Sequence, residues 1–126
     1  MNPAFVDTSA LLAIAFGEAG GASTIQRLAT FDALHASDLV VAELWSAFKR
    51  ERRDVDLSLI APLHVVIPGR SLGAEISRVL EAGYVRGADC WHLATALYLA
   101  SDPSELTFIT LDERQGAVAK ALGFTT

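Results

Sequence analysis

The sequence predicts an α/β fold in which a short, mainly parallel sheet is covered by helices on both faces, giving three layers. Short apolar runs alternate with longer stretches of helical spacing along the chain, and this alternation is typical of parallel sheets with crossover helices. The apolar runs are nearly unbroken, as expected for strands buried on both sides. With 126 residues, 52% of them hydrophobic, we expect one domain over residues 1–126.

Four apolar runs are the predicted strands, and a short segment at the end of the sequence is a further extended piece. The runs are AFV (4–6), ALHA (33–36), HVVI (64–67) and FIT (108–110), followed finally by FTT. Stretches of helical spacing between them predict helices over 8–16, 18–31, 38–53, 71–85, 89–100 and 112–122. Polar residues that cap helix N-termini stand at several starts, namely Thr8 or Ser9, Ser37 or Asp38, Ser71 and Asp89.

Composition excludes several classes of protein. The formal net charge of -5 argues against a protein that grips nucleic acid through bulk positive potential, although a nucleic-acid enzyme that uses a bound cation is still possible. Cys90 is the single cysteine beside three histidines, so neither an intrachain disulfide nor a Cys/His zinc site is expected. No apolar stretch approaches the roughly 18 residues that span a bilayer. We therefore expect a soluble, cytoplasmic protein without a membrane contact.

Four acidic residues stand almost alone in apolar segments: Asp7, Glu43, Asp89 and Asp112. A carboxylate among residues that favour burial suffers desolvation and, near other carboxylates, repulsion. A divalent cation is the usual compensation for both costs. The placement of these acids therefore predicts a metal site.

The predicted topology can bring the four acids together. Asp7 and Asp112 directly follow the first and the fourth predicted strand, so they meet at the carboxyl edge of the sheet if those strands are neighbours. Asp89 begins a helix at the same edge if the crossovers are right-handed. Glu43 lies about one and a half turns into its helix. One crevice could then hold all four carboxylates.

The donor types select the chemistry. Oxygen ligands without His or Cys suit Mg²⁺ or Mn²⁺ rather than zinc, and such ions promote attack of water on phosphate esters. Three hydroxyl residues flank the acids and could orient them through hydrogen bonds: Thr8, Ser9 and Thr110. Phosphoryl chemistry is therefore the leading reaction class.

Each acid also has a structural interpretation. Asp7, Asp89 and Asp112 could simply cap helices, and Glu43 could pair with an arginine in a salt bridge. His92 shares a helix face with Asp89, and it is either a packed histidine or a residue of the site.

Other conspicuous residues have interpretations of their own. The basic run at residues 49–54 (KRERRD) is a solvated helix end, an RNA contact, or both. Cys90 is expected in the core. Trp45 and Trp91 are expected in core or interface packing, with base stacking as the weaker alternative.

With these residues in place, the chain resembles the PIN domain family and, within it, the VapC toxins of bacterial toxin and antitoxin pairs. The resemblance covers nearly the whole chain. It rests on FVDTSALLAIAFGE, VVAELWSAFKR, GADCWHLATAL and FITLDERQGAVAKALG, in this order and spacing.

The resemblance implies a metal-dependent endoribonuclease in which Asp7, Glu43, Asp89 and Asp112 bind Mg²⁺ or Mn²⁺. It implies a structured RNA substrate such as tRNA or rRNA and cleavage of its phosphodiester bonds. It also implies a homodimer and a VapB-type antitoxin whose tail covers the groove, with operator DNA bound only through that antitoxin. Arg114, two positions after Asp112, would weaken the fourth ligand if it folded back onto it.

Two other classes of protein with acidic pockets do not match. A response-regulator receiver domain needs adjacent acids after its first strand, and a haloacid dehalogenase-type phosphatase needs an acid where Ser9 stands. The alternative that the residues leave open is a PIN-fold binding module with weak or no catalysis, because a fold by itself does not establish activity.

Overall fold

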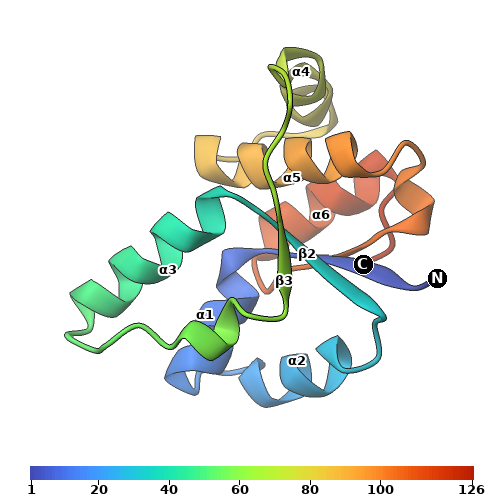
Figure 1. The fold of residues 1–126 in the computed structure, drawn as a ribbon. Helices are drawn as coiled ribbons and strands as arrows, with labels where there is room; N and C mark the ends of the chain where they lie inside the picture. The colour runs from blue at the N-terminus through green and yellow to red at the C-terminus, as the bar shows by residue number, and fades with distance from the viewer.

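The computed structural model describes all 126 residues and contains one four-stranded sheet in which every neighbouring pair is parallel. The spatial order is β3-β2-β1-β4, and helices cover both faces (Figure 1). The strands are β1 (Pro3–Val6), β2 (Ala33–Ser37), β3 (Leu63–Val66) and β4 (Thr107–Ile109). The predicted fold class is confirmed.

Six α-helices connect and flank the strands. They are α1 (Thr8–Phe16), α2 (Gly21–Leu28), α3 (Leu39–Arg50), α4 (Gly73–Ala82), α5 (Gly87–Leu99) and α6 (Glu113–Leu122). Two short 3₁₀ turns, Leu57–Leu59 and Pro103–Glu105, precede β3 and β4. None of the helices is both long and apolar enough to cross a bilayer.

Several predicted boundaries differ from those observed. The second helix was predicted to begin at 18 but begins at Gly21, because Gly20 adopts a left-handed conformation with φ 87° just before it. The fifth helix begins at Gly87, so Asp89 lies inside its first turn and is not its cap. The final FTT makes an isolated bridge between Thr107 and Thr125 and forms no strand.

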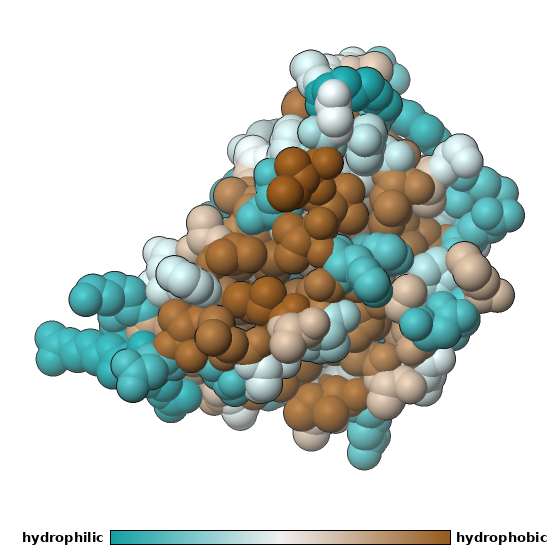
Figure 2. Space-filling view, in the orientation of Figure 1, coloured by the Kyte–Doolittle hydropathy of each residue, from teal (hydrophilic) through white to brown (hydrophobic).

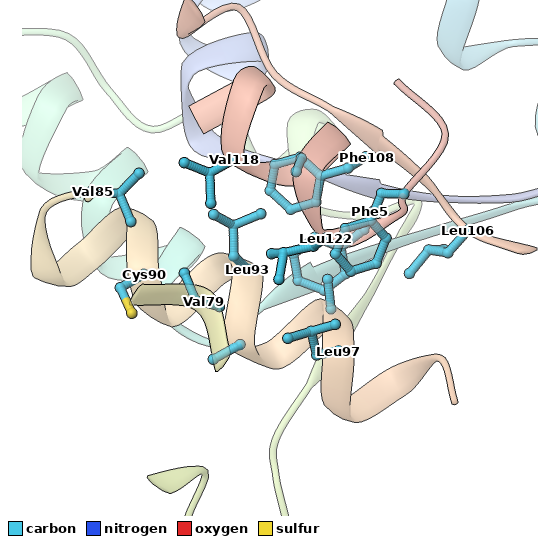
Figure 3. Close-up of a cluster of buried hydrophobic side chains, with 14 of the residues drawn as sticks. Phe5, Val79, Val85, Cys90, Leu93, Leu97, Leu106, Phe108, Val118 and Leu122 are labelled. Carbon is cyan, nitrogen blue, oxygen red and sulfur yellow. The ribbon is translucent and has the colours of Figure 1, made fainter. Parts of the chain in front are cut away.

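The sheet separates two hydrophobic clusters because side chains alternate along each strand. In β1, Phe5 points to one face, whereas Ala4 and Val6 point to the other. On the first face Phe5 stacks on Phe108 with ring centroids 5.6 Å apart, and residues of α4, α5 and α6 complete the cluster (Figure 3). The other cluster packs α1 and α3 against the sheet, with Leu11 and Leu44 almost fully buried.

The strand order determines where the ends of β1 and β4 lie. These strands are neighbours, as the topology argument requires, and they pair from Ala4 with Thr107 to Val6 with Ile109. Beyond the last pair, the backbone N–H of Asp7 donates to the carbonyl of Ile109 at 2.9 Å. The residues that follow these two strands therefore leave the sheet side by side at its carboxyl edge.

Candidate active site

A cleft of about 570 Å³ opens at this edge, and all four predicted acids line it. Asp7 is the N-cap of α1, Glu43 lies in α3, Asp89 lies in the first turn of α5, and Asp112 is the N-cap of α6. The full lining is Asp7, Thr8, Ser9, Leu12, Ala42, Glu43, Ser46, Ala47, Arg50, Asp89 and Asp112. The fold thus brings together acids from four separate elements.

Asp7 is held by hydrogen bonds on one of its two carboxylate oxygens. Its Oδ2 accepts from the Ser9 hydroxyl at 2.6 Å, from the Thr110 hydroxyl at 2.8 Å and from the backbone N–H of Ser9 at 3.4 Å. The residue is only 3% exposed, and its Oδ1 lies 3.7 Å from Nε2 of His92. Ser9 and Thr110 therefore orient Asp7, and the carboxylate caps α1 while it lines the cleft.

Glu43 is paired with a histidine rather than with an arginine. Its Oε1 lies 2.5 Å from Nε2 of His92 and accepts from the Thr8 hydroxyl at 2.7 Å. Burial alone would raise the pKa of Glu43, but the hydrogen bonds from His92 and Thr8 and the charge of His92 hold that pKa below its ordinary value. Glu43 is accordingly ionised at neutral pH and is oriented from two sides.

His92 belongs to the site, although it was not among the predicted site residues. It is fully buried, and its Nδ1 lies 2.7 Å from the Ser37 hydroxyl at the end of β2. Burial would lower the pKa of His92, but the hydrogen bond to Glu43 and the nearby charges of Asp7 and Asp89 raise it above its ordinary value. The three-residue spacing from Asp89 was the sequence signal for this role. No sequence signal identified Ser37 as its partner.

Asp112 both caps a helix and faces the cleft. Its Oδ1 accepts from the backbone N–H of Gln115 at 2.9 Å, and its own N–H donates to the Thr110 hydroxyl at 3.1 Å. Arg114 does not fold back onto Asp112, because its guanidinium lies 6.0 Å from the ring centroid of Tyr84. Arg114 therefore does not make the contact that would weaken Asp112 as a metal ligand.

The other three carboxylates influence the pKa of Asp89. Burial raises its pKa, and the negative charges of Asp7, Asp112 and Glu43 raise it further, partly offset by His92. Like charges disfavour ionisation of a carboxyl group in this way. The four acids are thus electrostatically coupled across the cleft.

The donor set fits a hard divalent cation, although the side chains are not arranged as a finished metal site. No three His, Cys, Asp or Glu side chains lie close enough together to hold an ion as they stand. All four acidic side chains nevertheless supply oxygen, and three of them raise the pKa of the fourth. A cation between them would relieve this repulsion, and oxygen ligands of this kind suit Mg²⁺ or Mn²⁺.

The other residues singled out in the sequence have clear positions. Cys90 is buried among the core residues, and burial raises the pKa of its thiol. Trp91 packs against the same core and donates its indole N–H to Asp38 at 2.9 Å. Trp45 was expected in core or interface packing; it is 51% exposed, so core packing is wrong for this residue and interface packing stays a prediction.

Comparison with known families supports the assignment that this geometry suggests. The sequence model of the PIN domain matches residues 4–121. The chain belongs to the PIN domain family. A search of curated proteins finds no significant match. PIN domains are commonly nucleases that use divalent metals, and the acidic cleft of this PIN domain has the residue types that such chemistry requires.

Proposed function

We propose that this PIN domain is an endoribonuclease that depends on Mg²⁺ or Mn²⁺ and hydrolyses phosphodiester bonds of RNA. The observation that carries the proposal is the lining of one cleft by four carboxylates from α1, α3, α5 and α6. Asp7, Glu43, Asp89 and Asp112 would hold the cation. When bound, the cation supplies Lewis acidity and neutralises charge that develops on the phosphate oxygens.

The protein's own side chains prepare this site. Ser9 and Thr110 donate to Oδ2 of Asp7 and leave its Oδ1 without a hydrogen bond. Thr8 and His92 keep Glu43 ionised in a fixed position. Such preorganisation reduces the reorganisation that binding and reaction demand.

We propose further that the protein is the toxin of a type II toxin-antitoxin system and acts in the cytoplasm on a structured RNA such as tRNA or rRNA. This proposal rests on the resemblance to VapC proteins. The same resemblance implies a VapB-type antitoxin, operator DNA bound only through that antitoxin, and a homodimer. A broad run of hydrophobic residues on the face that carries α3 and β3 (Figure 2) is compatible with a protein partner. Trp45 in α3 and Ile67 directly after β3 are both exposed.

The first test is cleavage of total RNA by the purified protein with Mg²⁺, Mn²⁺ or EDTA, with the cut sites mapped. The matched variant is Asp7→Asn, which removes a charge and retains the volume of the side chain. We expect discrete metal-dependent cuts from the wild type and a loss of at least about a hundredfold in the variant, with an unchanged circular dichroism spectrum. Full activity of Asp7→Asn would contradict the role of the cleft.

The second candidate function is a binding module with weak or no catalysis. Absence of cleavage by folded protein that carries no antitoxin would favour it.

Growth arrest on expression separates the toxin role from nuclease activity in general. Arrest should require Asp7, and coexpression of the cognate antitoxin should relieve it.

A further inference from the structure

Arg50 is the one cationic residue among the eleven that line the acidic cleft. It is the last residue of α3 and the second residue of the basic run at 49–54. The hydrophilic residues at the C-terminal end of α3 project from the molecule on the left of Figure 2. This position distinguishes Arg50 from the rest of the run, because no other base of that run contributes to the cleft.

Helix geometry makes one face of α3 a wall of the cleft. Glu43 and Arg50 are seven residues apart, which is two turns or about 10 Å along the helix axis. Ser46 and Ala47 lie between them on the same face and also line the cleft. The wall therefore runs from the carboxylates at one end to a guanidinium at the other.

The guanidinium of Arg50 is available to a ligand. Its side chain is 69% exposed, and its one ionic contact is with the adjacent Glu51 at 3.4 Å. Exposed pairs of this kind contribute little stability, so a stronger acceptor displaces them easily. Arg53 is different, because its guanidinium lies 5.2 Å from the ring centroid of Phe16 and donates to the Ala15 carbonyl at 3.5 Å.

We propose that Arg50 binds a phosphodiester of the RNA strand next to the one that is cleaved, and thereby positions the strand along α3. The inference rests on the proposed nuclease function. A cleft with four acids repels a polyanion, so a cation beside the reaction centre favours binding of the strand. A guanidinium presents paired N–H donors that match two phosphate oxygens. Its distance from Glu43 makes Arg50 a positioning residue.

The test compares Arg50→Gln with Lys49→Gln, which removes the same charge from the adjacent position of α3 outside the cleft lining. For cleavage, we expect Arg50→Gln to raise KM about tenfold with kcat little changed, and Arg50→Lys to restore part of the loss. For binding, both substitutions are made in the Asp7→Asn background and measured by fluorescence anisotropy at several salt concentrations. Only Arg50→Gln should lower the salt slope, by about one.

Three outcomes would overturn the proposal. One is equal binding by the Arg50→Gln and Lys49→Gln proteins, and another is a loss in kcat alone. The third is an unchanged salt slope in Arg50→Gln. If the wild type cleaves no RNA, the nuclease function fails, whereas the binding measurement still decides the role of Arg50. Thermal melting of each variant shows whether the fold is retained.

Discussion

The imidazole of His92 connects residues that are far apart in the chain. Its two ring nitrogens lie within hydrogen-bond distance of Glu43 and Ser37, and Asp7 is 3.7 Å away. A buried histidine with an adjacent carboxylate gains proton affinity that burial alone would remove. His92 therefore links the ionisation of Glu43 to the packing of α5 against the end of β2.

The substitution Glu43→Gln should lower the pKa of His92. The change removes the carboxylate that raises this pKa most, and the lowering effect of burial then has less to oppose it. Side-chain ¹H–¹⁵N NMR of the three imidazoles over pH checks this directly. His35 is the internal control, since burial and the neighbouring His64 lower its pKa and should do so in both proteins. An unchanged titration of His92 would show that Glu43 does not control its charge.

Among the elements, α1 and α2 approach each other unusually closely. A Cβ on Gly21, the first residue of α2, would lie 2.5 Å from the Ala13 carbonyl oxygen of α1. Because α1 also carries Asp7 at its N-cap with Thr8 and Ser9 in its first turn, a displacement of this helix moves one side of the cleft. The contact between the two helices therefore supports the position of the site.

Gly21→Ala should lower the free energy of unfolding by roughly 1–3 kcal/mol, because the added methyl group forces the two backbones apart. Gly73→Ala is the matched control at the first residue of α4, where a Cβ would meet nothing within 4 Å. That change should be neutral or stabilising by up to about 1 kcal/mol. Urea unfolding measures both. Equal effects of the two substitutions would contradict the proposed close contact.

At the scale of the whole molecule, the strand order converts four isolated acids into one charged cleft. β1 lies between β2 and β4, so the elements that follow β1, β2 and β4 reach the same edge of the sheet. Two hydrophobic clusters, one on each face of the sheet, stabilise the fold despite this concentration of negative charge. Burial raises the pKa of Asp89, and the charges of Asp7, Asp112 and Glu43 raise it further.

Mn²⁺ or Mg²⁺ should raise the melting temperature of the metal-free protein, because a cation that binds only the folded cleft stabilises it by mass action. Asp89→Asn should melt higher than the wild type without metal, since it removes one repelling charge, and should gain less from added metal. Differential scanning fluorimetry with a metal titration checks both expectations. No shift at saturating metal from about pH 6 to 8 would count against a shared site.

Local patterns were sufficient to predict the fold class and to single out the four acids. Strand and helix periodicity is written in neighbouring residues, and a carboxylate in an apolar segment stands out without any knowledge of its partners. The proximity of Asp7 and Asp112 followed from a topological rule for parallel sheets. Their roles in metal binding and cleavage are still predictions.

Only the tertiary structure shows which side chains of the site contact each other. Glu43 and His92 are 49 residues apart, and Ser37 and His92 are 55 apart. An arginine was therefore as reasonable a partner for Glu43 as the histidine that it meets. The position of Arg50 in the cleft also depends on tertiary structure, because it is set by how α3 packs against the sheet. Contacts of this kind depend on how α3 and α5 pack across the end of β2, and packing between residues so far apart in the chain is not encoded in local periodicity.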